Sequence, residues 1–226
     1  MSLNINIPKI NEYFNEDNIR INLEKYFSEI ANEWWKHQVS WNNEAYSIFR
    51  DHDKFLISIY LIKKTLDYYA RNFQKYSMNE FFSQEKIEID KFNVIEISNF
   101  FLIPKETVRR KLIELEKNGS IVKSNRKIVL ILSTLPFYKP TDSTKKIAYL
   151  LSKFSKILKK NKLTDKIIKA ETISKYIEKE FTYCWKLYYE LQLEISNNMR
   201  GYFTDFETYH IWGMCVINKS YNYPNN

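Results

Sequence analysis

Residues 93–131 read NVIEISNFFLIPKETVRRKLIELEKNGSIVKSNRKIVLI, a pattern that predicts two short helices at an angle, followed by a small hairpin. Asn93 suits the N-cap of a helix running to Phe101, because its side chain can accept a hydrogen bond from a free backbone N–H. Pro104 is typical of the first position of a second helix. Gly119 ends that helix, since glycine readily adopts the left-handed conformation found beyond helix ends.

Apolar residues mark one buried face on each predicted helix. They recur at spacings of three and four and are Val94, Ile97, Phe101, Val108, Leu112 and Leu115. Two β-rich runs follow, at 121–122 and 128–131, and the polar residues 123–127 between them resemble a turn. This arrangement predicts a hairpin with a basic tip.

The second helix must turn its charged residues outward if its apolar stripe faces inward. Lys105, Glu106, Arg109 and Arg110 would then lie on the outer surface of its N-terminal half. Such a helix fits the major groove of DNA, where arginine can pair bidentately with guanine and glutamate can accept from a cytosine amino group. The hairpin would meet phosphates or a minor groove.

The segment IPKETVRR at 103–110, with the Leu112, Leu115-Glu116, Gly119 and Ile121 that follow it, resembles the winged helix-turn-helix of bacterial transcription regulators. The similarity is to the Crp-like and GntR-like groups and covers about a fifth of the chain. It implies sequence-specific binding of double-stranded DNA. The residues expected to contact DNA are Lys105, Glu106, Thr107, Arg109, Arg110, Lys123, Arg126 and Lys127.

This chain departs from the family pattern in three respects. Leu102 stands at a turn position that is often a small residue, and Lys105 stands where arginine is common. Lysine cannot fork onto guanine as arginine does, so base contacts would shift to Arg109 and Arg110. The motif also lies mid-chain, with residues 51–70 as the expected first helix and Ile87–Ile89 as the expected first strand.

Basic charge is concentrated in this stretch. Residues 102–131 hold eight basic and three acidic side chains, a net charge of +5, while the whole chain of 226 residues carries +8. A basic patch on a helix and hairpin is the electrostatic footprint expected of a DNA-binding protein. The alternative is a protein-protein interaction module that uses a winged helix as scaffold.

The flanking segments are predicted to be helical. Residues 18–35 have helical spacing, and Trp34, Trp35 and Trp41 nearby are interpreted as a core anchor rather than a ligand pocket or a base-stacking platform. After Pro136 and Pro140 come an amphipathic helix at 144–160, a helix from Thr164 to about Met199 that Gly201 breaks, and a last helix at 206–216. The second of these three helices is the expected dimer element.

A second basic run, residues 145–169, contains nine lysines and one acid, Asp165. It is interpreted as the solvated face of an amphipathic helix, with an additional DNA or membrane surface as the alternative.

Several function classes lack their sequence signatures. No GxGxxG, Walker, GxSxG or HExxH motif is present, so no enzymatic activity or cofactor is expected. His37, His52 and His210 are far apart in sequence, which argues against a metal site. Cys184 and Cys215 form no CxxC, and Cys184 is interpreted as an inert core thiol. No stretch approaches the roughly 18 apolar residues of a membrane span.

The sequence therefore predicts a mainly α protein with a small antiparallel β-wing. The expected domains are an N-terminal helical segment (1–50), a winged helix-turn-helix (51–135) and a C-terminal helical domain (141–226) for dimerisation or effector binding. The expected function is transcriptional regulation by a cytoplasmic, nucleoid-associated homodimer on double-stranded DNA. The effector ligand, if any, is left open.

Overall fold

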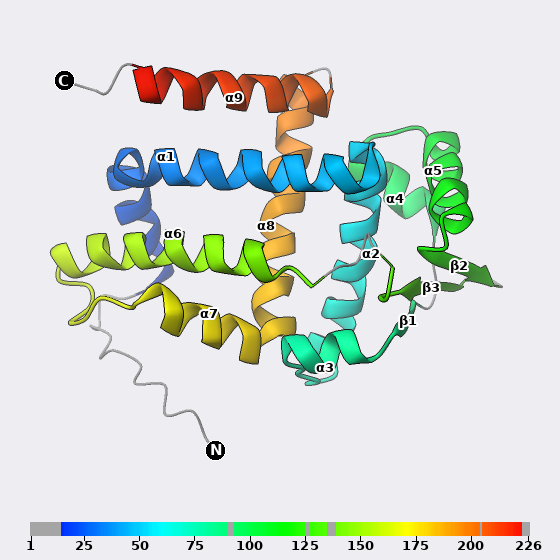
Figure 1. The fold of residues 1–226 in the computed structure, drawn as a ribbon, viewed down its shortest axis with the longest axis horizontal. Coiled ribbons are helices and arrows are strands. Elements are labelled where there is room, and N and C mark those ends of the chain that lie inside the picture. Colours follow the sequence, from blue (N-terminus) through cyan, green and yellow to red (C-terminus); the bar gives the residue numbers. More distant parts are fainter. Residues whose placement is uncertain (1–14, 90–92, 125–126, 135–138, 204, 223–226) are drawn as a thin grey trace. The chain divides into compact units, whose positions relative to one another are not determined.

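The computed structural model describes residues 15–89, 93–124, 127–134, 139–203 and 205–222 (Figure 1). The chain forms two compact units, each assembled from segments far apart in the sequence. Unit 1 comprises residues 1–41, 140–178 and 212–226, and unit 2 comprises residues 42–139 and 179–211. The three-part division expected from the sequence follows the chain in order, and those domain boundaries stay a prediction.

The described residues are mainly helical with a small antiparallel sheet, as the sequence predicted. The elements, in chain order, are α1 (Glu16–Phe49), α2 (His52–Arg71), α3 (Met78–Ser83), β1 (Lys86–Ile89), α4 (Val94–Phe101), α5 (Lys105–Lys117), β2 (Ile121–Ser124), β3 (Lys127–Ile131), α6 (Thr141–Lys160), α7 (Ala170–Lys179), α8 (Phe181–Tyr202) and α9 (Phe206–Asn222). In this part of the chain, no helix combines the length and apolarity needed to cross a bilayer.

Unit 2 is built around α2, which packs along α8 (Figure 1). Asp51 caps α2 by accepting a hydrogen bond from the backbone N–H of Lys54 at 2.8 Å. The helix buries residues on most of its circumference, including Leu56, Ile57 and Leu61, which are fully buried. A helix that is apolar around most of its circumference is covered on several sides.

The sheet of unit 2 has the strand order β1-β3-β2, with both pairs antiparallel. Leu130 of β3 lies opposite Ile87 of β1 and Ile121 of β2, and all three side chains are buried. Side chains alternate between the two faces of a strand, so the opposite face carries Glu88 and Val122, which are exposed. The predicted strand and hairpin are thus confirmed, and the hairpin strands lie side by side.

In unit 1 the N-terminal part of α1 packs on α6. Ile30 of α1 and Leu150 and Ile157 of α6 form a buried cluster. Trp41 is buried, and Trp35 packs edge-to-face on Trp212 of α9 with ring centroids 5.0 Å apart. Trp41 is thus a core residue, as expected, whereas Trp34 and Trp35 are half-buried.

The single helix predicted from Thr164 to Met199 is wrong. The chain instead forms α7 and α8, which are separated at Glu180. There the backbone N–H of Thr182 donates to the Tyr76 carbonyl at 3.2 Å, and the Tyr76 N–H donates to the Thr182 hydroxyl at 3.1 Å. These tertiary hydrogen bonds replace helical ones, so the helix is interrupted without a proline or glycine.

Other boundaries also differ from the prediction. Thr164 does not cap a helix, because its hydroxyl donates to the Lys166 carbonyl in the loop before α7. Gly201 does not break α8, which continues to Tyr202. The first helix is longer than expected, because the helical pattern of residues 18–35 continues to Phe49 in α1.

Candidate nucleic-acid interface

A tight turn connects α4 to α5. Leu102 adopts the left-handed conformation, with φ of 53°, and its side chain is 84% exposed. The Ser98 hydroxyl donates to the Ile103 carbonyl at 2.6 Å, and the Ile103 N–H donates to the Ser98 carbonyl at 3.1 Å. These bonds hold a turn at the position where the family pattern favours a small residue.

The inner face of α5 is the one that the sequence predicted. Val108, Leu112 and Leu115 are each no more than 1% exposed. Pro104 lies just before the helix, which begins at Lys105, rather than at its first position. Gly119, with φ of 71°, lies beyond the end of α5, as predicted.

The outer face of α5 carries four of the predicted DNA contacts. Lys105, Glu106, Arg109 and Arg110 are exposed, whereas Thr107 is half-buried. Arg109 forms an ion pair with Glu106, and Arg110 Nε lies 4.0 Å from Glu114. Both arginines therefore have an acidic neighbour on their own helix.

The hairpin lysines also have acidic partners. Lys123 Nζ lies 2.9 Å from Glu116, and this hydrogen bond lowers the pKa of the Glu116 carboxyl below its ordinary value. Lys127 forms an ion pair with Glu88 of β1. Arg126, the remaining predicted contact on the hairpin, lies outside the described residues.

Sequence reasoning did not identify the polar contacts that hold α5 on α2. Lys111 is 9% exposed and forms an ion pair with Asp51, the residue that caps α2. Burial alone would raise the pKa of Asp51, but the hydrogen bonds from Lys111 and from the Lys54 N–H lower it below its ordinary value. Lys54 also lies 3.2 Å from Glu114 of α5. Lys111 lies three residues after the buried Val108, and this helical spacing was the sequence signal that placed Lys111 on the inner side of α5.

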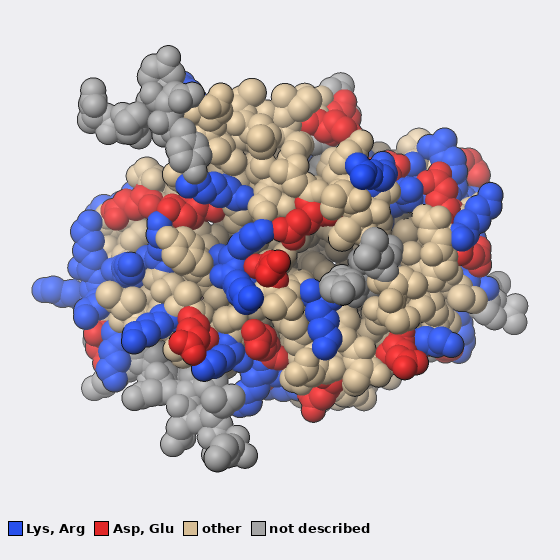
Figure 2. Space-filling model, viewed as in Figure 1, with Lys and Arg blue, Asp and Glu red and all other residues tan. Residues whose placement is uncertain are grey.

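The surface around α5 and the hairpin is of mixed charge. Where these elements lie in Figure 1, Figure 2 shows blue and red side chains next to one another. Asp51 and Glu88 come from outside residues 102–131 and add two acidic partners to the three acids within that stretch. Arg109, Arg110, Lys123 and Lys127 are thus cations at this surface that each have an acidic side chain close by.

Cys184, His52 and His210 are further chemistry-bearing residues of unit 2. Cys184 is half-buried, and burial raises the pKa of its thiol to about 11. The inertness of this thiol stays a prediction. His52 Nδ1 lies 3.0 Å from Glu207 Oε1, and burial lowers the pKa of His210. Within the described ranges, no group of three or more histidine, cysteine or acidic side chains is placed to hold a metal ion.

No protein-family model, curated protein or solved structure matches this chain.

Proposed function

We propose that unit 2 contains a winged helix-turn-helix that binds double-stranded DNA sequence-specifically, in the service of transcriptional regulation. The element order is α2, α3, β1, α4, α5, β2, β3, in which α3 is a short helix between α2 and β1. This order and the strand order β1-β3-β2 support the proposal. They supply a first helix, a helix-turn-helix and a hairpin in the sequence that such a module requires. In this proposal α5 enters the major groove and the β2–β3 hairpin lies on the adjacent backbone.

The observation that carries the proposal is the two-sided character of α5. Val108, Leu112 and Leu115 anchor the helix in the core, while its opposite face presents Lys105, Arg109 and Arg110. A recognition helix needs this combination, because its side chains read base edges only if the backbone beneath them is held rigidly.

The ion pairs on α5 do not prevent DNA binding. The Arg109 and Glu106 side chains are 53% and 68% exposed. Exposed pairs of this kind contribute at most about 1 kcal/mol. A bidentate arginine–guanine contact contributes about 1–3 kcal/mol of discrimination. The proposal therefore requires Arg109 to leave Glu106 for guanine, at a cost of at most about 1 kcal/mol.

The experiment that tests the proposal is binding to duplex DNA measured against salt. Fluorescence anisotropy with a random-sequence duplex should show affinity falling steeply between about 50 and 200 mM salt, because cations that bind phosphates release counterions. Selection from a random pool should then yield a preferred site. A palindromic site would support binding by a homodimer.

Arginine substitutions distinguish specific binding by the outer face of α5 from the general attraction of a basic protein to DNA. Arg109→Ala with Arg110→Ala should abolish preference for the selected site. Arg20→Ala with Lys25→Ala is the matched control, because it also removes two exposed cations from one helix, and Arg20 likewise lies beside an acid four residues away, Glu24 at 3.4 Å. Absence of binding at low salt, or equal losses in the double variant and the control, would contradict the proposal.

A protein-interaction role is the second candidate, and exposed apolar side chains favour it. Ile95, Leu102 and Ile113 are 56%, 84% and 44% exposed on α4, the turn and α5. A protein partner would bury such residues, whereas a major groove has less apolar surface to offer. The salt titration distinguishes the two candidates, since a pure interaction module would not bind the random duplex.

A further inference from the structure

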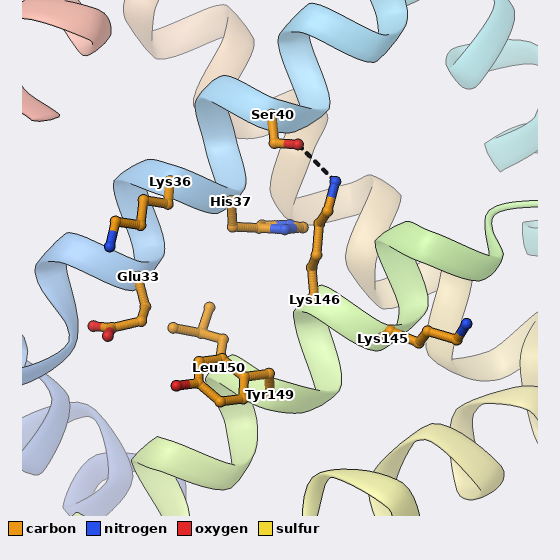
Figure 3. A pocket seen from close by; sticks show the side chains of 8 residues that line it. All are labelled: Glu33, Lys36, His37, Ser40, Lys145, Lys146, Tyr149 and Leu150. Carbon is orange, nitrogen blue, oxygen red and sulfur yellow. Dashed lines mark hydrogen bonds between the residues drawn. The ribbon is translucent and has the colours of Figure 1, made fainter.

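A cavity in unit 1, between α1 and α6, is lined by polar side chains that already interact within the protein. Figure 3 shows these side chains, among which the Lys146 ammonium donates to the Ser40 hydroxyl at 2.6 Å. Glu33, on the same lining, forms an ion pair with Lys153. A ligand would have to displace these contacts, so this cavity is less suited to a further binding role than the outer face of α5 in unit 2.

Ile113 is an apolar side chain in the middle of that charged face. It is 44% exposed. All residues of α5 are described, and its other exposed side chains are charged: Lys105, Glu106, Arg109, Arg110 and Lys117. Single exposed apolar residues are common on protein surfaces, so the exposure of Ile113 becomes informative only through its position.

The position of Ile113 is in line with the side chains that the proposed function assigns to base contacts. Ile113 follows Glu106 by seven residues, Arg109 by four and Arg110 by three. Side chains at these spacings lie on the same side of a helix. A helix that presents Arg109 and Arg110 to a major groove therefore presents Ile113 to it as well.

The helix beneath Ile113 is fixed to the rest of unit 2. The preceding Leu112 is 1% exposed, and Lys111 forms an ion pair with Asp51 of α2. A β-branched side chain in a helix also adopts mainly one χ1 rotamer. Ile113 therefore loses little conformational freedom when another molecule covers it.

Thymine offers the apolar group that fits such a side chain. Its C5 methyl projects into the major groove, where apolar side chains contact it, whereas arginine and glutamate pair with the polar edges of guanine and cytosine. Contact between the isoleucine and the methyl group removes apolar surface of both from water. The outer face of α5 thus combines polar and apolar base recognition.

We propose that Ile113 contacts the C5 methyl group of a thymine and is a specificity-determining residue of α5. This inference rests on the proposed DNA-binding function and adds one base to its target. Four helical residues span about 6 Å, and successive base pairs are about 3.4 Å apart. The thymine therefore lies within about two base pairs of the base that Arg109 contacts.

The test uses the duplex selected from a random pool, with each thymine replaced in turn by deoxyuridine. Deoxyuridine keeps the base pairing of thymine and lacks only the methyl group. Fluorescence anisotropy of the full chain should show affinity falling about three- to fivefold at one thymine, or at its symmetry-related pair, because burial of one methyl group is lost. Replacement at the other thymines should leave the affinity unchanged.

Ile113→Ala should remove this discrimination. The variant should bind the unmodified duplex about three- to fivefold more weakly and should bind the thymine and deoxyuridine duplexes equally. The fold is retained, because the side chain is exposed and alanine is the best helix former. Ile21→Ala is the matched control, since Ile21 is 51% exposed on α1, and it should keep the full discrimination.

The outcomes separate this inference from the proposed function. Discrimination that survives Ile113→Ala, or a selected duplex in which no deoxyuridine changes the affinity, overturns the assignment of Ile113. Sensitivity to Arg109→Ala with Arg110→Ala would in that case still support DNA binding by α5. A wild-type chain that binds no duplex at low salt overturns both proposals.

Discussion

Lys111 of α5 and Asp51 at the start of α2 form an ion pair whose side chains are only 11% and 22% exposed. Asp51 also accepts the hydrogen bond that caps α2. One carboxylate thus caps α2 and pairs with a lysine of α5, the proposed recognition helix. A partly buried pair of this kind differs from the exposed pairs elsewhere on α5, because removing one partner leaves the other charge poorly solvated.

We expect substitutions at Asp51 to separate its two roles. Asp51→Asn keeps a good N-cap and loses the ion pair, so the free energy of unfolding should fall by about 1 kcal/mol. Asp51→Ala loses both contributions and should cost about 2–3 kcal/mol. Urea unfolding followed by circular dichroism measures both changes.

Asp142→Asn is the matched control for that series. Asp142 is 80% exposed and lies 4.0 Å from Lys145 in the first turn of α6, so the same substitution should change stability by less than about 0.5 kcal/mol. A cost at Asp142 equal to that at Asp51, or a fully stable Asp51→Ala protein, would show that the Lys111–Asp51 pair has no structural role.

The ion pair should also give stability a pH dependence of definite sign. The pKa of Asp51 in the folded protein lies below its ordinary value of 3.8. Its contribution is therefore fully present above pH 3.8 and is lost as the pH falls through the folded-state pKa. The difference in urea midpoint between the wild type and Asp51→Asn should be present at pH 7 and should shrink well below pH 3.8. A difference that persists unchanged at low pH would contradict this assignment.

The elements of unit 2 were predictable because their signals are local. The Asn93 cap, the spacing of Val108, Leu112 and Leu115, and the Gly119 stop each act within a few residues. The break between α7 and α8 was not predictable, because it depends on hydrogen bonds between Thr182 and Tyr76, 106 residues apart.

The exposed side chains of the candidate interface were predictable for the same reason, whereas their partners were not. Helical periodicity alone turns Lys105, Arg109 and Arg110 outward. Pairing of Lys127 with Glu88 requires the register of β1 on β3, and that register comes from tertiary structure. The positive charge expected for this surface from residues 102–131 alone was therefore too high.

Leu102 is the position where we expect a substitution to increase stability. Its φ of 53° is unfavourable for a residue with a Cβ, and its side chain is 84% exposed, so little burial is lost on truncation. Leu102→Gly should raise the free energy of unfolding by about 0.5 kcal/mol after the greater entropy of the unfolded glycine chain is subtracted. The measurement is the urea midpoint at constant slope.

Two controls isolate the backbone conformation as the cause. Leu102→Ala removes the side chain but keeps the strain, so its stability should stay near that of the wild type. Gly119→Ala introduces a Cβ where φ is 71° and nothing lies within 4 Å of the new atom, so it should cost about 1 kcal/mol through conformation alone. A stabilised Leu102→Ala protein would instead assign the effect to the exposed leucine side chain.

Glu106 should weaken binding to DNA because it holds Arg109 and adds negative charge to the outer face of α5. Glu106→Gln should therefore strengthen binding to a random duplex by about two- to fivefold at low salt, the range that an exposed pair of at most about 1 kcal/mol allows. It should also steepen the salt dependence of binding, because Arg109 becomes available for a phosphate.

Glu171→Gln is the control for net charge. Glu171 is an exposed acid on α7 paired with Lys175 at 2.7 Å, so its substitution changes the net charge equally and should leave the affinity for DNA unaltered. If the two variants strengthen binding alike, the gain reflects net charge, and α5 is not specifically the helix that binds DNA. If Glu106→Gln weakens binding, the Glu106 carboxylate itself contacts the DNA, for example by accepting a hydrogen bond from a cytosine amino group.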